Sequence, residues 1–171
     1  TDSYNEGQMM NRLVQTARIA DEIGNTDSRN KIINTVKERL EDWLTYESGE
    51  KAFLFYYNSE WSTLIGYPAG HGQDVNINDH HFHWGYFIHA ASFLQQFDPE
   101  WVEKWGPMIN FLIRDAASTA RSDTKFPFLR NFSPYAGHSW ANGFASFPAG
   151  NDQESTSESM QFNSSLIHWG T

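Results

Sequence analysis

Residues 78–97 read NDHHFHWGYFIHAASFLQQF, and this stretch decides the fold. Its larger part, from Trp84 to Phe97, is almost entirely apolar, which is typical of a helix that is buried on every side. Asp98 and Pro99 follow it, and this pair suits the cap and the first turn of another helix. We therefore predict a buried helix over 84–97 and a second helix directly after it.

Helical periodicity continues on both sides of this stretch. Gly24 follows the first expected helix where a C-terminal cap glycine belongs, and Ser48-Gly49 is the expected stop of the second. Gly106-Pro107 predicts a break or kink in the fourth. The expected helices cover residues 10–23, 28–44, 84–97, 100–119 and a last segment from about Gln153 onward.

Two segments do not follow the helical pattern. The β-favouring runs 52–57 and 61–65 predict a small β-hairpin between helices. Residues 121–152 form a long stretch rich in Pro, Gly and aromatic residues, and connections longer than about 12 to 15 residues are usually functional or disordered. Its aromatic content argues against disorder. The sequence thus predicts an all-α fold of helical hairpins, in one region over 1–171, with a β-hairpin and long aromatic active-site loops.

Composition excludes several classes of protein. Twelve Lys and Arg against 21 Asp and Glu give a net charge of −9, which disfavours nucleic-acid binding. No apolar run reaches the roughly 18 to 20 residues of a membrane-spanning helix. The chain has no Cys, so it has no thiol nucleophile and no zinc–thiolate site. Aromatic residues make up 16%, which fits a sugar-binding surface.

The densest polar cluster contains Asp79 and three histidines, His80, His81 and His83. On a helix Asp79 and His83 share a face, and an imidazole one turn from a carboxyl group can manage the proton of an acid catalyst. The alternative is that Asp79 caps the helix while the histidines only pack.

A metal site is a second interpretation of the same cluster. His81 and His83 have the spacing of two ligands on an extended segment. Further ligands could come from His89, His138 or Glu154. No second His pair and no His-Glu-x-x-His motif supports this interpretation.

A pair of glutamates, Glu154 and Glu158, forms the second cluster. The two lie four residues apart among Ser and Thr, and a helix from Gln153 puts them on one face. They could simply be exposed first-turn acids that favour the helix dipole. Their place at the end of the aromatic loop favours function. Two carboxyl centres beside an aromatic loop are what glycoside hydrolysis requires.

Three motifs resemble glycoside hydrolase family 81, the endo-β-1,3-glucanases. The motifs are residues 78–87, Gly137-His138-Ser139-Trp140-Ala141 and residues 153–158, in the family's order; Tyr4-Asn5-Glu6-Gly7, Phe126-Pro127 and Arg114-Asp115 also match. The resemblance implies an inverting endo-hydrolase of β-1,3-glucan with an (α/α)6 barrel, preceded in the family by a β-sandwich domain. It implies neither a cofactor nor a resident metal.

Residue roles are carried over from the resemblance. Asp79 becomes the general acid with His83 as its partner, Glu154 the expected base, and Glu158 a second essential carboxylate. The residues that we expect to bind substrate are His80, Tyr86, Arg130, Tyr135, His138 and Trp140.

Length sets the remaining expectations. Twelve barrel helices with short loops need about 190 residues, so 171 residues hold part of a barrel. We expect an apolar edge or self-association at the incomplete side. The resemblance implies an extracellular protein that acts on fungal-wall or laminarin-type glucan. Two alternatives stay open: a truncated, non-catalytic glucan-binding fragment and a His-based metalloprotein.

Overall fold

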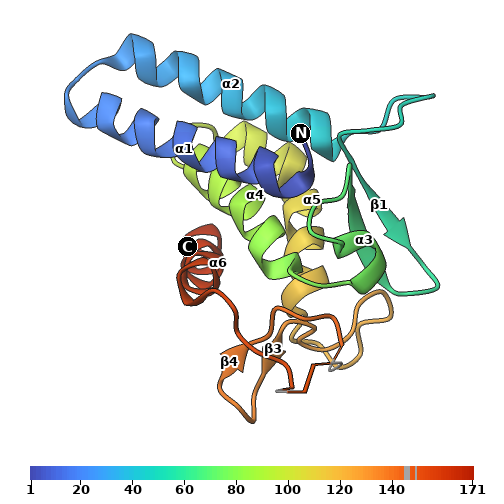
Figure 1. Ribbon diagram of the computed structural model, residues 1–171. Coiled ribbons are helices and arrows are strands. Elements are labelled where there is room, and N and C mark those ends of the chain that lie inside the picture. Colours follow the sequence, from blue (N-terminus) through green and yellow to red (C-terminus); the bar gives the residue numbers. More distant parts are fainter. Residues whose placement is uncertain (145–146, 149) are drawn as a thin grey trace.

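The computed structural model describes residues 1–144, 147–148 and 150–171 (Figure 1). It is mostly helical. The helices are α1 (Ser3–Glu22), α2 (Thr26–Leu44), α3 (Gln73–Asn76), α4 (His80–Leu94), α5 (Pro99–Ala117) and α6 (Thr156–Trp169). The strands are β1 (Leu54–Asn58), β2 (Thr63–Tyr67), β3 (Phe132–Ser133) and β4 (His138–Ser139). The predicted all-helical character and the hairpin β1–β2 are confirmed. The predicted loop over 121–152 carries the short β3–β4 pair, and three of its residues lie outside the described part.

Helix α4 is the centre of the structure. All of its residues are buried, and it packs against α1, α5 and α6. Two glycines allow the close approach of these helices: a Cβ on Gly7 of α1 would lie 2.7 Å from the Cβ of Tyr86, and one on Gly85 would lie 3.3 Å from that of Phe162 in α6. The predicted buried helix is therefore present, but it begins at His80, so the histidine cluster belongs to its first turn.

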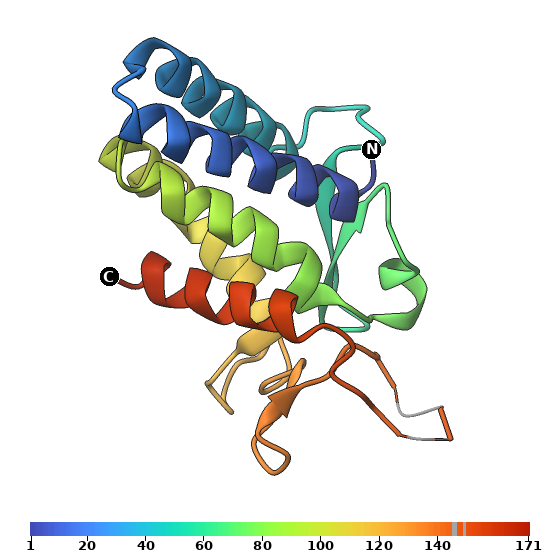
Figure 2. The ribbon, with the colours of Figure 1, turned by 60° about the vertical axis from the view of Figure 1, so that its left-hand side comes forward.

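Helices α1, α4 and α6 run in the same direction, side by side (Figure 2). Their N-termini therefore gather at one end of the molecule, where the loop of residues 121–152 also lies. The unpaired N–H groups of helix N-termini favour negative charge nearby. Asp79, Glu154 and Glu158 lie at this end.

Helix α5 continues through Pro107 without the expected break. A proline inside a helix frees the carbonyl group four residues earlier, here that of Glu103. Both residues are exposed, so water can bond the freed carbonyl group. The opposite face of α5 is buried through Trp101, Ile109 and Leu112.

A buried carboxylate, Asp115 of α5, holds separate parts of the chain together. Its two oxygens accept hydrogen bonds from Thr63 Oγ1 (3.1 Å) and Leu64 N (3.0 Å) of β2, and from His80 Nδ1 (2.6 Å) and Trp84 Nε1 (2.7 Å) of α4. The guanidinium group of Arg130, in the long loop, lies 3.3 Å away. Burial opposes ionisation, but His80 and Arg130 outweigh it and lower the pKa of Asp115. Asp115 therefore joins the hairpin, the central helix and the loop.

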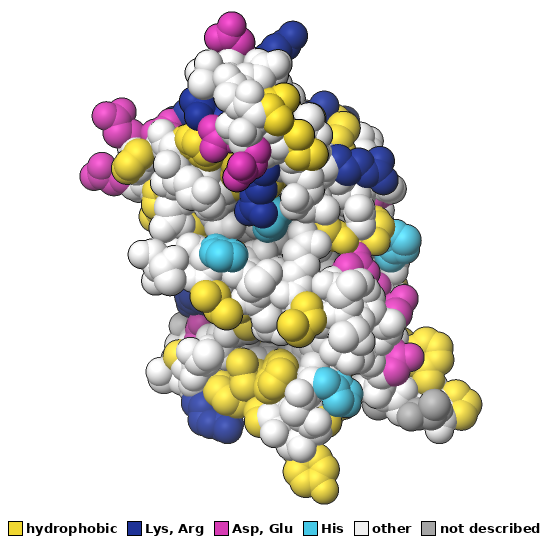
Figure 3. All heavy atoms as spheres, turned by 90° about the vertical axis from the view of Figure 1, so that its left-hand side faces the viewer, with side chains coloured by type: hydrophobic (Ala, Val, Ile, Leu, Met, Phe, Trp, Pro, Cys, Tyr) yellow, Lys and Arg dark blue, Asp and Glu magenta, His cyan; other side chains and the backbone are white. Residues whose placement is uncertain are grey.

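The surface carries scattered apolar side chains. Figure 3 shows them in several groups between charged residues on one face. Met160 and Ile167, seven residues apart on α6, are 64% and 67% exposed. Self-association through such side chains stays a prediction. No helix among the described residues is long and apolar enough to cross a membrane.

Replacing Asp115 with Ala should lower the free energy of unfolding by about 3 to 5 kcal/mol, because it removes the buried acceptor shared by His80 Nδ1, Trp84 Nε1 and the Arg130 guanidinium group. Urea unfolding followed by circular dichroism measures this loss. The exposed Asp27, in the first turn of α2, provides the control: Asp27→Asn should cost less than about 1 kcal/mol. Equal losses in the two variants would contradict the role given to Asp115.

Candidate active site

A cavity of about 70 Å³ lies at the end where the three helix N-termini meet. It collects polar side chains that are far apart in the sequence. Its lining residues are Tyr4, His71, Asp79, Phe82, His83, Glu154 and Glu158. All four residues expected to be catalytic, Asp79, His83, Glu154 and Glu158, thus line one cavity.

Asp79 occupies the N-cap position of α4, but its side chain makes no capping hydrogen bond. Its backbone is left-handed, with φ 60°. Asn78 Nδ2 donates to its Oδ2 at 2.6 Å, while the buried Oδ1 has no partner among the described residues. The simple capping interpretation is therefore wrong, and one carboxyl oxygen is left available for chemistry.

The acidity of Asp79 is strongly changed by its surroundings. Burial and, second, the nearby charge of Glu154 raise the pKa of Asp79 to about 6. A carboxyl group with this pKa keeps its proton in a substantial fraction of molecules at mildly acid pH. Asp79 is thus suited to deliver a proton, which is what a general acid must do.

The two glutamates do not share a helix face, contrary to the prediction. Helix α6 begins at Thr156, because the side chain of Ser155 accepts the backbone N–H of Glu158 at 3.3 Å and caps the helix there. Glu154 precedes the helix in a left-handed conformation, with φ 57°, and is exposed. The bend still brings both side chains to the same cavity. Neither is a simple solvent-facing acid of the first helical turn, because both line this cavity.

Glu158 is held by a network from α1 and α4. Tyr4 Oη and Tyr86 Oη donate to its Oε1 at 2.9 and 2.7 Å, and Gln8 Nε2 donates to both tyrosine oxygens at 3.1 and 2.6 Å. Each tyrosine hydroxyl group has one proton, which it donates to Glu158. Its oxygen can then only accept from Gln8, whose amide group has two protons, one for each tyrosine. Burial and the charge of Glu158 raise the pKa of both tyrosines, so these protons stay in place.

Tyr86 therefore holds a carboxylate, although we expected it to bind substrate. It is 4% exposed, and its hydroxyl group is already bonded to Glu158 and Gln8.

His83 lines the cavity as a neutral ring. Burial, followed by the charges of His80 and His71, lowers the pKa of His83 to about 3. Its Nδ1 lies 2.8 Å from Ser3 Oγ, while its buried Nε2 has no partner in the described part of the chain. The only hydrogen bond found between His83 and Asp79 in the described residues is a backbone one of 3.0 Å. Nε2 of the imidazole is thus placed to form a hydrogen bond with a molecule in the cavity, as donor or acceptor according to the tautomer.

His80, which we expected to bind substrate, lies outside the cavity of the carboxylates. His80 is completely buried. Its Nδ1 is hydrogen-bonded to Asp115 at 2.6 Å, and its Nε2 lies 3.1 Å from the carbonyl oxygen of Gln73. Both ring nitrogens face oxygen acceptors, so the ring ties α4 to its surroundings.

The arrangement for a histidine metal site is also missing. His81 and His83 lie on a helix and not on an extended segment, so they point to different sides. His81 packs against Phe82 with 3.9 Å between ring centroids, and His89 lies 3.5 Å from Ser165 Oγ. No group of three or more metal-ligating side chains is found in the described part of the chain.

The aromatic loop lies beside the carboxylates. Arg130, Tyr135 and Trp140 line a further cavity of about 430 Å³, and Tyr135 is fully exposed. His138 lies in β4 with Nδ1 on the carbonyl oxygen of Ser139 at 2.7 Å, and it does not line either cavity. The loop is fixed to α4 by a hydrogen bond of 2.8 Å from Asp79 N to Ala141 O.

Comparison with known proteins identifies the family of the chain. Residues 1–171 match the glycosyl hydrolase family 81 C-terminal domain. The chain belongs to glycosyl hydrolase family 81.

Relatives of this family 81 chain are similar over its whole length. It is 49% identical to a glucan endo-1,3-β-D-glucosidase of Acetivibrio thermocellus, over 99% of this chain and 22% of that protein. It is 47% identical to a glucan endo-1,3-β-D-glucosidase of Thermobifida fusca, over 100% of this chain and 23% of that protein. A solved structure of a mutant family 81 glycoside hydrolase from Clostridium thermocellum superposes with a TM-score of 0.96 at 48% identity, over 99% of this chain and 24% of the other. The chain therefore spans about a quarter of the length of these relatives.

Gln8, His71 and Tyr4 belong to the candidate site and were missed by sequence reasoning. Gln8 and His71 carried no usable signal, since one lies on an ordinary helix and the other in a poorly periodic stretch. Tyr4 carried a signal, because it opens a motif that matches the family, but its role required the distance to Glu158.

Titration of Asp79 tests the electrostatics of the family 81 site without any substrate. In carbon-13 NMR of carboxyl-labelled protein, the Asp79 resonance should titrate near pH 6. Glu154→Gln should lower that pH by removing a like charge, yet leave it above the ordinary value of 3.8, because burial is the larger cause. Glu100→Gln, on the exposed start of α5, should leave it unchanged. An Asp79 that titrates near 4 would overturn the description of this site.

The raised pKa of Asp79 also predicts how stability depends on pH. The folded state disfavours the ionised side chain, so stability is fully present below the ordinary pKa of 3.8 and falls as pH rises through about 6. Asp79→Asn, which removes the charge and keeps the shape, should therefore be more stable than the parent at pH 8. This gain should vanish at pH 3.5 or below. Thermal unfolding at both pH values measures it, and a gain that does not depend on pH would contradict the prediction.

Proposed function

We propose that this chain carries the catalytic carboxylates of an endo-acting β-1,3-glucan hydrolase that works by an inverting acid/base mechanism. One observation carries the proposal: Asp79, with its pKa of about 6, lines a single cavity together with Glu154 and Glu158. Glycoside hydrolysis needs a proton donor and a carboxylate on opposite sides of the bond. The names of the relatives, glucan endo-1,3-β-D-glucosidases, supply the linkage.

The proton comes from Asp79. Its unpartnered Oδ1 is the free position from which a proton reaches the glycosidic oxygen as the bond to the anomeric carbon breaks. After donation the carboxylate is stabilised by Asn78 Nδ2. The like charge of Glu154 favours the return of a proton to Asp79 after each turnover.

The attacking water is activated by Glu154. Its side chain lines the cavity from an exposed bend, where solvent supplies water. In an inverting enzyme this water attacks the anomeric carbon from the face opposite the acid, and the base takes its proton. Glu158, fixed by Tyr4 and Tyr86, acts as the second essential carboxylate that orients the water or a sugar hydroxyl group. Neutral His83 forms a further hydrogen bond through Nε2.

The remaining parts of the proposal concern the whole protein. We propose that the helices belong to an (α/α)6 barrel, that the protein acts outside the cell on laminarin, curdlan or fungal-wall glucan, and that Arg130, Tyr135, His138 and Trp140 contact the glucan. The chain covers about a quarter of its relatives, so activity is to be measured both for these 171 residues and for a longer protein that contains them.

Asp79→Asn and Glu154→Gln should each lower kcat on laminarin by at least about 100-fold, because each removes one half of the acid/base pair. A reducing-sugar assay measures the rate, and proton NMR of early products should show the α-anomer, as inversion of a β-linkage requires. Glu103→Gln, on the exposed face of α5, serves as the control and should keep full activity. Full activity in both site variants, or β-anomeric products, would contradict the mechanism.

A non-catalytic glucan binder is the alternative. Calorimetry with laminari-oligosaccharides, run beside the reducing-sugar assay, separates the two: heat of binding without release of reducing ends, in the longer protein as well, selects the alternative.

A further inference from the structure

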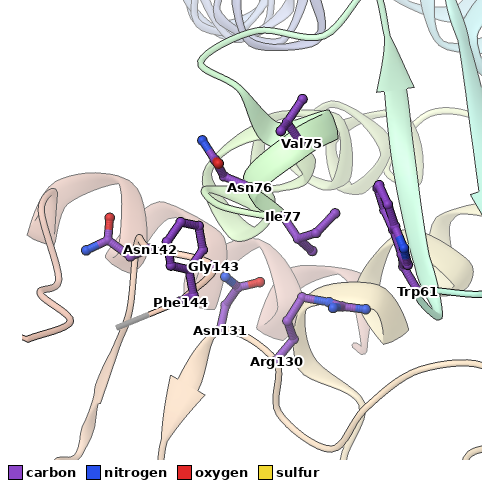
Figure 4. A pocket seen from close by; sticks show the side chains of 9 residues that line it. All are labelled: Trp61, Val75, Asn76, Ile77, Arg130, Asn131, Asn142, Gly143 and Phe144. Carbon is purple, nitrogen blue, oxygen red and sulfur yellow. The ribbon is translucent and has the colours of Figure 1, made fainter. Parts of the chain in front are cut away.

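A second polar cavity lies beside the tip of the β1–β2 hairpin. It measures about 350 Å³, which is within the usual range for small-molecule sites. Figure 4 shows its side chains converging from three segments: the hairpin, the turn before α4 and the aromatic loop. The lining side chains include Trp61, Ile77, Arg130, Asn131, Asn142 and Phe144.

Trp61 offers the cavity a flat apolar face. It is 52% exposed, so the fold does not use this indole to fill its core. Its position is nevertheless fixed: Asn58 Oδ1 accepts the backbone N–H groups of Glu60 and Trp61 at 3.0 and 3.1 Å, and the next carbonyl group, that of Ser62, accepts from Arg130. An indole that is half exposed on a fixed backbone is suited to stack on an apolar ring face.

Asn131 supplies a hydrogen-bond acceptor that the fold leaves unused. The residue is 3% exposed, and its Oδ1 has no partner in the described part of the chain. An amide oxygen that is buried without a partner is costly, so such atoms call for an explanation. In Figure 4 the side chain stands at the wall of the cavity, close to Arg130.

Arg130 supplies the matching donor. Its Nε and Nη2 are used by Asp115 and Ser62, which fix the guanidinium plane. The described residues offer its Nη1 no acceptor. A fixed donor next to an unused acceptor matches a sugar hydroxyl group, which both accepts and donates.

The cavity also lies next to the candidate acid. Asn76 and Ile77 line it, and Asp79 follows them by two residues and faces the cavity of the carboxylates. A polysaccharide chain bound across the carboxylates would therefore pass close to Trp61.

We propose that this cavity is a carbohydrate subsite, in which Trp61 stacks on one glucosyl ring of a β-1,3-glucan while Arg130 and Asn131 bond its hydroxyl groups. The inference rests on the proposed function for the identity of the sugar. In this subsite Trp61 and Asn131 bind the glucan away from the bond that is cleaved.

Calorimetry with laminarihexaose tests the subsite in the Asp79→Asn background, where the ligand is not cleaved. Trp61→Ala should weaken binding about ten-fold, since stacking and the buried ring face are lost, while Trp61→Phe should recover most of the affinity. Asn131→Ala should weaken it as well. Tyr56, equally exposed on the same hairpin but outside this cavity, gives the matched control: Tyr56→Ala should leave the affinity unchanged.

Equal affinity of the parent and Trp61→Ala would overturn the subsite, as would equal losses in Trp61→Ala and Tyr56→Ala. Nitrogen-15 NMR adds a direct readout, because the indole resonance that disappears in Trp61→Ala should shift on addition of laminarihexaose. Binding that depends on Trp61, together with no release of sugar by the protein that retains Asp79, would refute the proposed hydrolysis and keep the subsite. Hydrolysis by the protein that retains Asp79, together with binding that does not depend on Trp61, would support the proposed function and refute the subsite.

Discussion

The buried carboxylate of Asp115 is where three otherwise separate parts of the chain meet. It bonds the backbone and side chain of the β2 strand, two side chains of α4 and the arginine that fixes the long loop. A hairpin of this size and a loop of this length have little stability of their own, so their positions depend on such a contact. His80, one of its partners, is the residue directly after Asp79, so the same interaction also fixes the start of α4. The position of the candidate acid therefore depends on a buried carboxylate that lies outside the cavity of the carboxylates.

The second constraint is the shared direction of α1, α4 and α6. Because their N-termini lie at one end, each helix contributes a group to the same small cavity: Tyr4 from α1, Asp79 from the start of α4 and Glu158 from α6. Helix N-termini favour negative charge, which helps to hold several carboxylates close together. The site still retains unfavourable features, such as the unpartnered oxygen of Asp79 and the unpartnered nitrogen of His83. Such features are typical of functional sites, where stability is lower in exchange for chemistry.

Particular residues show how far sequence reasoning reached. The apolar run from Trp84 identified the central helix, and the motifs that resemble the family pointed to Asp79, His83, Glu154 and Glu158, four of the seven residues that line the carboxylate cavity. The roles of neighbouring residues were less accessible. His80 and His83 are three positions apart and lie near each other on the helix surface, yet His80 bonds Asp115 of α5 while His83 contacts Ser3 of α1 and lines the cavity, because different elements pack against each ring. Glu154 was placed on α6 because four-residue spacing fits a helix, but the cap at Ser155 begins the helix after it.

The sequence by itself determined the mostly helical class and the family, and it supplied the candidate carboxylates, since all of these depend on local pattern and residue type. Only the tertiary structure decided which groups meet and in what state. The pKa of Asp79 near 6 arises from burial and from Glu154, which lies 75 positions away in the chain. Likewise, Gln8 reaches Glu158 through two tyrosines only because Gly7 lets α1 approach α4 closely. Acidity and hydrogen bonding depend on distance through space, and distance through space is set by packing rather than by position along the chain.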